Sequence, residues 1–227
     1  MKRKELQELL LEAPYDALVL TSEANRRYAT GFHSTAGAVY LSAKQAVFYT
    51  DFRYVEAARA AVTDFEVREI GVGRSYTAAI NELIEQDDVR TVALEDETLT
   101  HAEYTRWATA LHATAMRLED SVARLRVTKE DDEVGKIVAA QRIAEQALEE
   151  VMNDIRVGVT EKEIAARLTY LMLHYGAENM SFDPIVVSGA NSSKPHGVPT
   201  EKQIEAGDFV TMGFGCIVDG YCSDMTR

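Results

Sequence analysis

Two side chains in the last third of the sequence belong to residue types that take part in catalysis or metal binding. His196 stands in the loop sequence Pro195-His196-Gly197, and loops often carry binding residues. Asp224 lies near the end of a strand-like segment, where a carboxylate could serve as a metal ligand or a catalytic group. From the residues alone, an exposed loop histidine and a solvated aspartate are the more ordinary interpretations.

A hairpin positions the aspartate. The pair Asp219-Gly220 predicts a two-residue turn of type I′ between two strands. Centring the turn on this pair places Gly213 opposite Thr226. Because side chains alternate between the two faces of a strand, Asp224 lies on the same face as Gly213 and Thr226. One carboxylate therefore faces the position of a residue that has no side chain.

Strand-like and helix-like segments alternate in the first half of the chain, which predicts a layered α/β domain with a mixed sheet. A close pair of strands around residues 43–45 adds an antiparallel hairpin to that sheet. The predicted strands are residues 15–21, 37–42, 46–50, 65–70, 91–95 and 115–119, and the predicted helices are residues 2–11, 51–62, 77–86 and 100–113.

The pattern changes near Leu125, which predicts a domain of residues 1–125 followed by a second one of residues 126–227. A capping sequence at residues 128–131 predicts a long amphipathic helix. Its predicted apolar positions are Val134, Ile137, Val138, Ala144, Leu148, Val151, Met152 and Ile155. A second capping sequence, Thr160 to Glu163, predicts another helix that packs against the first. Strands and polar loops follow, with strands predicted at 185–188, 208–217 and 221–226.

Composition limits the classes of partner. Hydrophobic residues make up 46% of the chain and charged residues 27%, which is typical of a folded globular protein. The net charge of -13 opposes binding to nucleic acid or to an anionic membrane. No apolar run is long enough to span a bilayer, and the first residues lack the apolar stretch of a signal peptide, so we expect a cytoplasmic protein. Cys216 and Cys222 fall on opposite hairpin faces, which argues against a disulfide.

Several motifs, in order along the whole chain, resemble those of Xaa-Pro aminopeptidases and prolidases. In the first half these are Asn25-Arg26-Arg27-Tyr28-Ala29-Thr30-Gly31-Phe32 and Tyr49-Thr50-Asp51-Phe52-Arg53-Tyr54. In the second half they are Ser181-Phe182-Asp183-Pro184, Ser188-Gly189-Ala190-Asn191, Pro195-His196-Gly197, Gly207-Asp208 and Gly220-Tyr221-Cys222-Ser223-Asp224-Met225-Thr226-Arg227. The resemblance implies a creatinase-like N-terminal domain followed by an incomplete, C-terminally truncated pita-bread catalytic domain of the α+β type.

The resemblance also implies a chemistry. Members of this family are metallopeptidases in which two Asp, one His and two Glu hold two divalent ions (Mn, Co or Zn), which activate water to remove residues next to proline. By this resemblance Asp224 matches the Asp that bridges the two metals, and His196 matches a substrate-side histidine that is not a primary ligand. It further implies a proline-containing peptide as substrate and a homodimer as the assembly.

Two departures lead us to expect no stably bound metal and no activity in this chain. The family has an Asp where this chain has Gly213, and the chain ends at Arg227, before the expected His and both Glu ligands. One ligand of five is then left, which does not hold a divalent ion in a catalytic geometry. Two alternatives stay open: a non-catalytic dimerisation or binding remnant of the family, and a creatinase-like C–N hydrolase.

Overall fold

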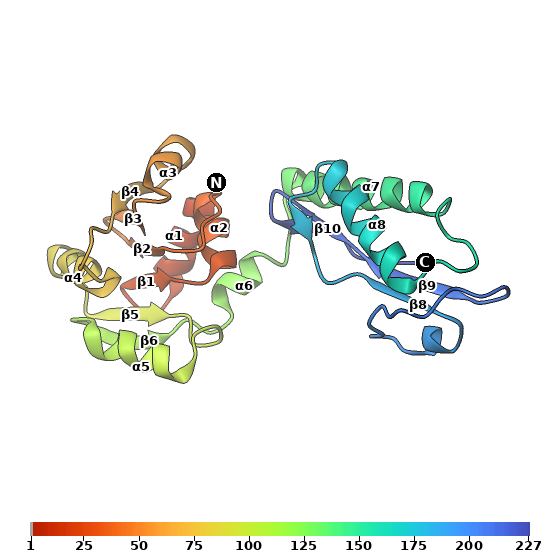
Figure 1. Cartoon of the computed structure of the whole chain (residues 1–227). Coiled ribbons are helices and arrows are strands. Elements are labelled where there is room, and N and C mark those ends of the chain that lie inside the picture. Colours follow the sequence, from red (N-terminus) through yellow and green to blue (C-terminus); the bar gives the residue numbers. More distant parts are fainter. Residues whose placement is uncertain (1) are drawn as a thin grey trace. The chain divides into compact units, whose positions relative to one another are not determined.

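The computed structural model describes residues 2–227, which form two compact units (Figure 1). The first unit ends at Thr128 and the second runs from Lys129 to Arg227. Each unit has its own sheet or sheets and its own buried apolar cluster.

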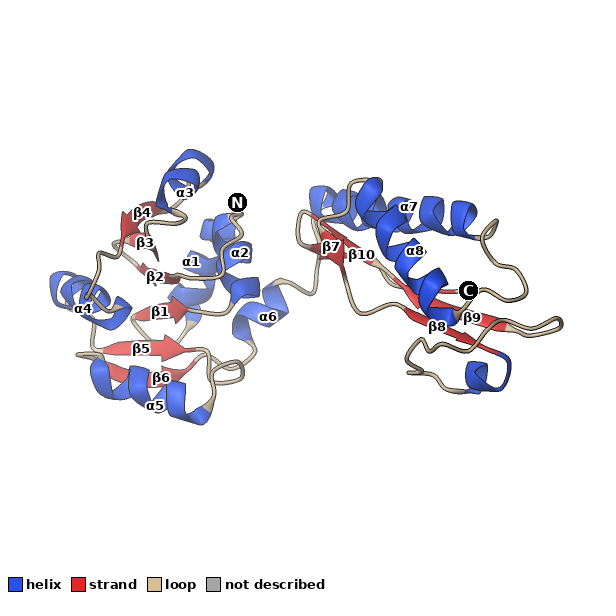
Figure 2. Ribbon diagram, viewed as in Figure 1, coloured by secondary structure: helices blue, strands red, loops and turns tan. Residues whose placement is uncertain are grey.

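The first unit is built on a six-stranded sheet with the order β4-β3-β2-β1-β5-β6 (Figure 2). The central pairs β1–β2 and β2–β3 are antiparallel, and the outer pairs are parallel, which confirms the predicted mixed sheet. The strands are β1 (Ala17–Leu20), β2 (Ala38–Ser42), β3 (Ala46–Thr50), β4 (Glu66–Glu69), β5 (Thr91–Leu94) and β6 (Thr114–Arg117).

Helices cover both faces of this sheet, because the central strands are buried on both sides and need apolar partners on each. One face packs against α1, α2, α3 and α6, and the other against α4 and α5. None of the helices in residues 2–227 is long and apolar enough to cross a membrane. The helices are α1 (Lys2–Glu12), α2 (Glu23–Thr30), α3 (Val55–Ala61), α4 (Tyr76–Asp87), α5 (His101–Ala110) and α6 (Ser121–Leu125).

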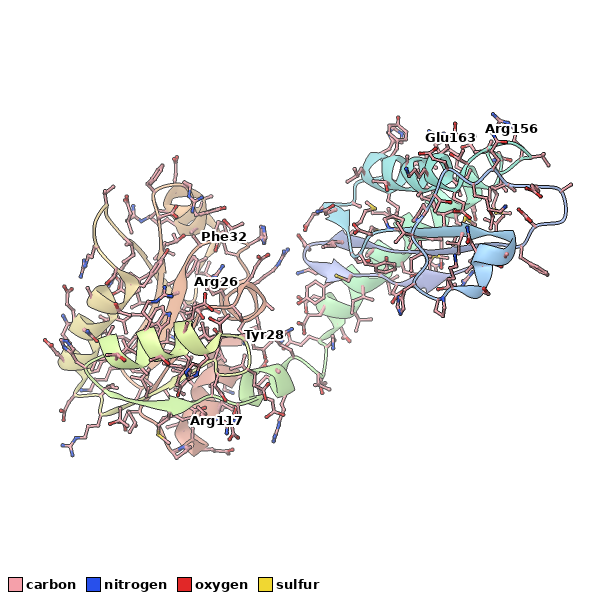
Figure 3. All side chains as sticks on the ribbon, turned by 60° about the horizontal axis from the view of Figure 1, so that its bottom comes forward. Arg26, Tyr28, Phe32, Arg117, Arg156 and Glu163 are labelled. Atoms are coloured by element: carbon pink, nitrogen blue, oxygen red, sulfur yellow. The ribbon has the colours of Figure 1, made fainter. Side chains whose placement is uncertain are left out.

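The helix α2, which was not predicted, contains the first of the resembling motifs, and its residues serve the fold. Asn25 donates a hydrogen bond of 2.7 Å to the buried carboxylate of Glu95. The guanidinium of Arg26 is buried and donates to the carbonyl oxygens of Thr21 and Ser34 (Figure 3). This motif therefore ties α2 to the ends of β1 and β5.

The second resembling motif also differs from its expected local structure. The helix predicted from residue 51 begins only at Val55, with Tyr54 as its N-cap. Asp51 does not cap it. Its carboxylate instead accepts hydrogen bonds from the backbone N–H of Arg53, at 3.0 Å, and from the Arg53 side chain, which makes a local turn.

The second unit opens with two helices, α7 (Asp131–Val151) and α8 (Glu161–His174), which pack against each other as predicted. The cap of α7 differs from the prediction. The N-cap is Glu130, the third residue of the predicted capping sequence 128–131, and it forms a capping box with Glu133. The helix therefore begins two residues later than predicted. The predicted capping box of Thr160 and Glu163 on α8 is confirmed.

The buried face of α7 consists mainly of small residues. Val134, Val138 and Met152 were predicted to be apolar packing positions, but they are 46%, 48% and 55% exposed. The predicted positions Ala144 and Val151 are buried, and so are Ala140 and Ala147, which were not predicted. The Sγ of Cys216 in the underlying sheet lies 3.2 Å from the carbonyl oxygen of Ala140, so the helix approaches the sheet too closely for large side chains on that face.

Two three-stranded sheets complete the second unit, with the orders β11-β10-β7 and β12-β9-β8. The predicted strand 208–217 is in fact two strands separated at Gly215, and the strand 221–226 is likewise divided. The cause is a close approach: a Cβ on Gly215 would lie 2.0 Å from the carbonyl oxygen of Ser223. The strands are β7 (Asn179–Met180), β8 (Ile185–Ser188), β9 (Val210–Phe214), β10 (Cys216–Val218), β11 (Tyr221–Cys222) and β12 (Met225–Thr226), and a short 3-10 helix, η1 (Gly189–Ser193), follows β8.

Limited digestion with trypsin should separate the two units. Arg126 belongs to the first unit, since its guanidinium donates to Asn25 Oδ1 at 2.8 Å, whereas Lys129 is exposed in the segment before α7. We expect the first cut between Arg124 and Lys129 and a resistant N-terminal fragment, measured by gel and mass spectrometry. First cuts within residues 65–95 would contradict this division.

Candidate functional site

Asp224 lies between β11 and β12 with an exposed side chain. Its neighbours Ser223 and Met225 are buried, and Met225 packs into the core beneath α7 and α8. Since successive side chains of an extended segment point to opposite faces, Asp224 is on the face away from the two helices. The predicted register is confirmed: Thr226 pairs with Gly213, and Ile217 pairs with Cys222.

The turn of this hairpin has the predicted geometry. Asp219 and Gly220 have φ angles of 49° and 74°, and two positive values in succession are those of a type I′ turn. Cys216 is buried and Cys222 is exposed, and both are free thiols, as the register predicted.

Gly213 lies on the same sheet face as Asp224, and its packing does not require a glycine. A Cβ placed there would lie 3.5 Å from Cβ of Ile185 and 3.8 Å from Oγ1 of Thr226, which are ordinary contact distances. Gly213 also lacks the positive φ that favours glycine. A larger side chain would therefore fit at this position, and its absence leaves Asp224 without a carboxylate partner there.

His196 is exposed in the segment between η1 and β9. The next residue, Gly197, is buried against β8, because a Cβ on it would lie 2.6 Å from Cγ1 of Val187. Val187 alternates with Val186, which packs into the helix-side core, so Val187 belongs to the other face of the sheet. The loop thus passes over the edge strand β8 and reaches the face on which Asp224 and Gly213 lie.

The ends of this loop are held by Glu161, a residue that sequence reasoning missed. Its carboxylate is 0% exposed and accepts hydrogen bonds from Ser188, Asn191 and Thr200. Burial raises its pKa, but the hydrogen bonds from Thr200, Ser188 and Asn191 outweigh that effect and lower the pKa to about 2. No pattern in the sequence links Glu161 to residues 27 to 39 positions away, so the contact is visible only in the structure.

The donor set of the second unit does not fit a two-metal centre. Within residues 2–227, no three His, Cys, Asp or Glu side chains lie together in a way that could hold a metal ion. Neither Asp224 nor His196 makes a hydrogen bond or an ion pair in this part of the chain. The arrangement can present one free carboxylate and one free imidazole on the same sheet face, but not a ligand cage.

Comparison with known families assigns both units. Residues 2–128 match the creatinase/prolidase N-terminal domain, and residues 135–227 match metallopeptidase family M24. The chain belongs to the Xaa-Pro aminopeptidase and prolidase family. This confirms the expected fold, a creatinase-like domain followed by part of a pita-bread domain.

Relatives of this peptidase family extend well beyond the matched region. An uncharacterized peptidase of Bacillus subtilis is 36% identical over the whole chain, which covers 64% of that relative. The solved Xaa-Pro dipeptidase from Bacillus anthracis is 38% identical, with a TM-score of 0.94, and the chain covers 63% of it. The X-Pro aminopeptidase from Thermotoga maritima is 33% identical, with a TM-score of 0.91 and 64% covered. The chain thus spans less than two thirds of each of these proteins.

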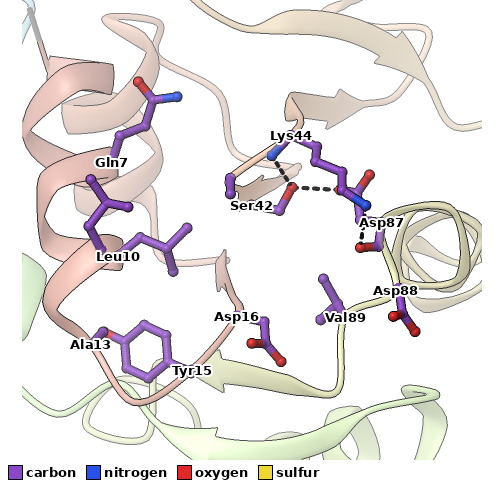
Figure 4. Close-up of a pocket in the computed structure, with 12 residues that line it drawn as sticks. Gln7, Leu10, Ala13, Tyr15, Asp16, Ser42, Lys44, Asp87, Asp88 and Val89 are labelled. Carbon is purple, nitrogen blue, oxygen red and sulfur yellow. Dashed lines mark hydrogen bonds between the residues drawn. The ribbon is translucent and has the colours of Figure 1, made fainter.

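The first unit of this family member also contains a cavity of about 550 Å³, between α1 and the start of β1 (Figure 4). Several of its polar groups are already used by the fold. Asp87 accepts hydrogen bonds from Ser42 and, at 2.9 Å, from Gln45, while Lys44 Nζ donates to the backbone carbonyl of Asp87 at 2.8 Å. None of the sequence-predicted site residues lines this cavity.

Gly215, where the backbone of the other hairpin strand leaves no space for a Cβ, should tolerate no side chain. We expect Gly215→Ala to lower the free energy of unfolding of the second unit by about 3 kcal/mol, because its Cβ would overlap backbone. Gly213→Ala is the matched control and should change it by about 0.5 kcal/mol or less. Calorimetric unfolding of each variant measures the difference, and equal effects would contradict the assigned packing.

Acid should weaken the contribution of Glu161. Its folded pKa of about 2 lies below the ordinary 4.5, so its stabilisation is present above about pH 4.5 and is lost as pH falls toward 2. We expect the stability difference between wild type and Glu161→Gln to shrink by roughly 3 kcal/mol between pH 6 and pH 2. Urea unfolding at both values tests this, and a pH-independent difference would refute it.

Proposed function

We propose that this chain is part of an Xaa-Pro peptidase, a metal-dependent hydrolase that removes N-terminal residues next to proline, and that these 227 residues alone form no working metal centre. The proposal is supported by the two family matches and by relatives described as Xaa-Pro dipeptidase and X-Pro aminopeptidase. The single observation behind the second part is the lone Asp224 carboxylate on the sheet face where Gly213, opposite Thr226, has no side chain.

The family resemblance implies five ligands for two divalent ions, and Asp224 alone matches that set. A divalent ion held by one exposed carboxylate keeps most of its water, so binding is weak and the geometry is not fixed. His196 then has no metal-bound substrate to act on, although its loop reaches the same sheet face. In this proposal the chain supplies the bridging carboxylate and the substrate-side imidazole, Gly213 leaves the other Asp ligand missing, and the His and two Glu ligands are not among these residues.

A second candidate is a non-catalytic binding or dimerisation module of the same family. The observation that favours it is the first unit, whose six-stranded sheet is covered on both faces and has its own buried clusters. Such a unit folds without help from the second. Release of a stable, self-associating N-terminal fragment would support this candidate.

Metal titration and a peptidase assay test the main proposal. We expect calorimetry with Mn²⁺ to show binding in the millimolar range or weaker, and no proline release from an Xaa-Pro dipeptide. Gly213→Asp should tighten Mn²⁺ binding, because a second carboxylate fits on the same face, yet give no turnover. Mutual repulsion of two exposed carboxylates with no further ligands limits the gain.

The control is Asp219→Asn, which removes a carboxylate from the turn of the same hairpin and keeps a residue that tolerates positive φ. It should leave Mn²⁺ binding of both the wild type and the Gly213→Asp variant unchanged, whereas Asp224→Asn should abolish the gain. Stoichiometric binding of two metals at micromolar affinity, or turnover that survives Asp224→Ala, would refute the proposal.

A further inference from the structure

We propose that Glu161 is the positioning residue for the His196 loop: one buried carboxylate holds both ends of residues 189–199 and so sets where the imidazole stands on the sheet face. The meaning of this position for catalysis rests on the proposed function. The placement itself does not, because it concerns only the loop and the groups that hold it.

Each oxygen of Glu161 serves one end of the loop. At the first end, Oε1 accepts hydrogen bonds from Ser188 N at 2.7 Å, Ser188 Oγ at 3.0 Å and Asn191 Nδ2 at 3.2 Å. At the second end, Oε2 accepts from Thr200 N at 3.0 Å and Thr200 Oγ1 at 2.7 Å. Two of these donors are backbone N–H groups, which can donate but cannot accept a hydrogen bond. Both side-chain oxygens of Glu161 must therefore be acceptors.

Apart from Gly189, whose N–H donates to Phe209 O at 2.9 Å, the loop between these ends makes few contacts with the rest of the unit. Lys194, Pro195 and His196 are exposed, and the hydrogen bonds within the loop are local, such as Gly197 N to Lys194 O at 3.1 Å. Gly197 packs on Val187, but this contact depends on the loop already crossing the edge of β8. The two stems therefore decide the path of the loop, and Glu161 joins them.

Glu161 is itself fixed by helix α8. It is the first residue of the helix, directly after the N-cap Thr160, and its own backbone N–H donates to Lys202 O at 3.1 Å. The helix packs into the core through Ile164 and Leu168, which are buried. Glu161 thus couples both ends of the loop to the core of the unit, together with the backbone hydrogen bond of 3.2 Å from Lys162 N to Thr200 O.

A cation beside the loop supports the first stem. Lys202 Nζ donates to Ser188 Oγ at 3.1 Å and forms an ion pair of 2.6 Å with Asp208. The side chain of Asp208 lies against Gly189, where an added Cβ would be 2.5 Å from Asp208 Oδ1. The φ of +54° at Gly189 also favours glycine. Glu161, Lys202 and Asp208 are the charged groups that meet at this stem.

Hydrogen exchange followed by NMR on the complete 227-residue chain tests the proposal. Glu161→Gln keeps the shape but points an NH2 group at one set of donors, so one stem loses its acceptor. We expect the amides of Ser188, Thr200, Lys194 and Gly197 to exchange at least about tenfold faster, while the amides in the middle of α8 keep their rates. The ring signals of His196, assigned with His196→Gln, should broaden or split.

Glu163→Gln is the matched control, because Glu163 is an exposed carboxylate in the first turn of the same helix (Figure 3). It should leave the exchange rates of the loop and the His196 signals unchanged. If Glu161→Gln prevents folding, Thr200→Val removes one of the five bonds and should accelerate exchange at Thr200 and the loop about two- to fivefold.

Two outcomes would overturn the proposal. In one, the loop amides and the His196 signals do not respond to Glu161→Gln or Thr200→Val. In the other, exchange accelerates equally throughout residues 129–227, which is what a merely structural glutamate would cause. Metal binding and turnover play no part in this readout, so its failure is separate from a failure of the proposed peptidase function.

Discussion

A buried carboxylate that accepts hydrogen bonds from two distant chain segments is the interaction on which both units depend. In the first unit Glu95 accepts from Thr21, Ser22 and Asn25 and joins the end of β5 to the start of α2. In the second, Glu161 does the same for the two ends of the His196 loop. A carboxyl group can remain buried in this way because its oxygens are satisfied by several donors, including backbone N–H groups.

These two glutamates explain why motifs shared with peptidases are not all chemical in purpose. Asn25 and Arg26 belong to a motif of the N-terminal domain, yet both are buried and bonded within the fold. Ser188 and Asn191 belong to a motif of the second domain and are donors to Glu161. Resemblance between sequences therefore reports the framework of the site as much as its reacting groups.

The face of the β12-β9-β8 sheet that points away from α7 and α8 is the place we propose for the chemistry. Asp224 and Gly213 lie on it, and the His196 loop reaches it around the edge strand β8. A metal centre requires several converging ligands, and no three His, Cys, Asp or Glu side chains within residues 2–227 converge in this way. The space at Gly213 could accept a second carboxylate. What is missing at this position is therefore a side chain, since the backbone would allow one.

The sequence by itself determined the local features of this protein. The Asp219-Gly220 turn requires two positive φ values, and the register that follows from it placed Gly213 opposite Thr226. Strand and helix periodicity likewise gave the mixed sheet and the helix α8. The family motifs predicted the two domains, because each motif is a short run of consecutive residues that can be recognised without knowing the fold.

Tertiary structure decided what depends on contacts between distant residues. Only the packing of α7 on the sheet showed that Ala140 and Ala147 join its buried face while Val134 and Val138 stay exposed, since close approach favours small side chains over the large ones that periodicity selects. Only the structure showed that the predicted strands are divided, because the backbone at Gly215 lies against that of the opposite strand. Glu161 reads as an ordinary first-turn residue of a helix, and its role emerges because folding brings Ser188 and Thr200 to its two oxygens.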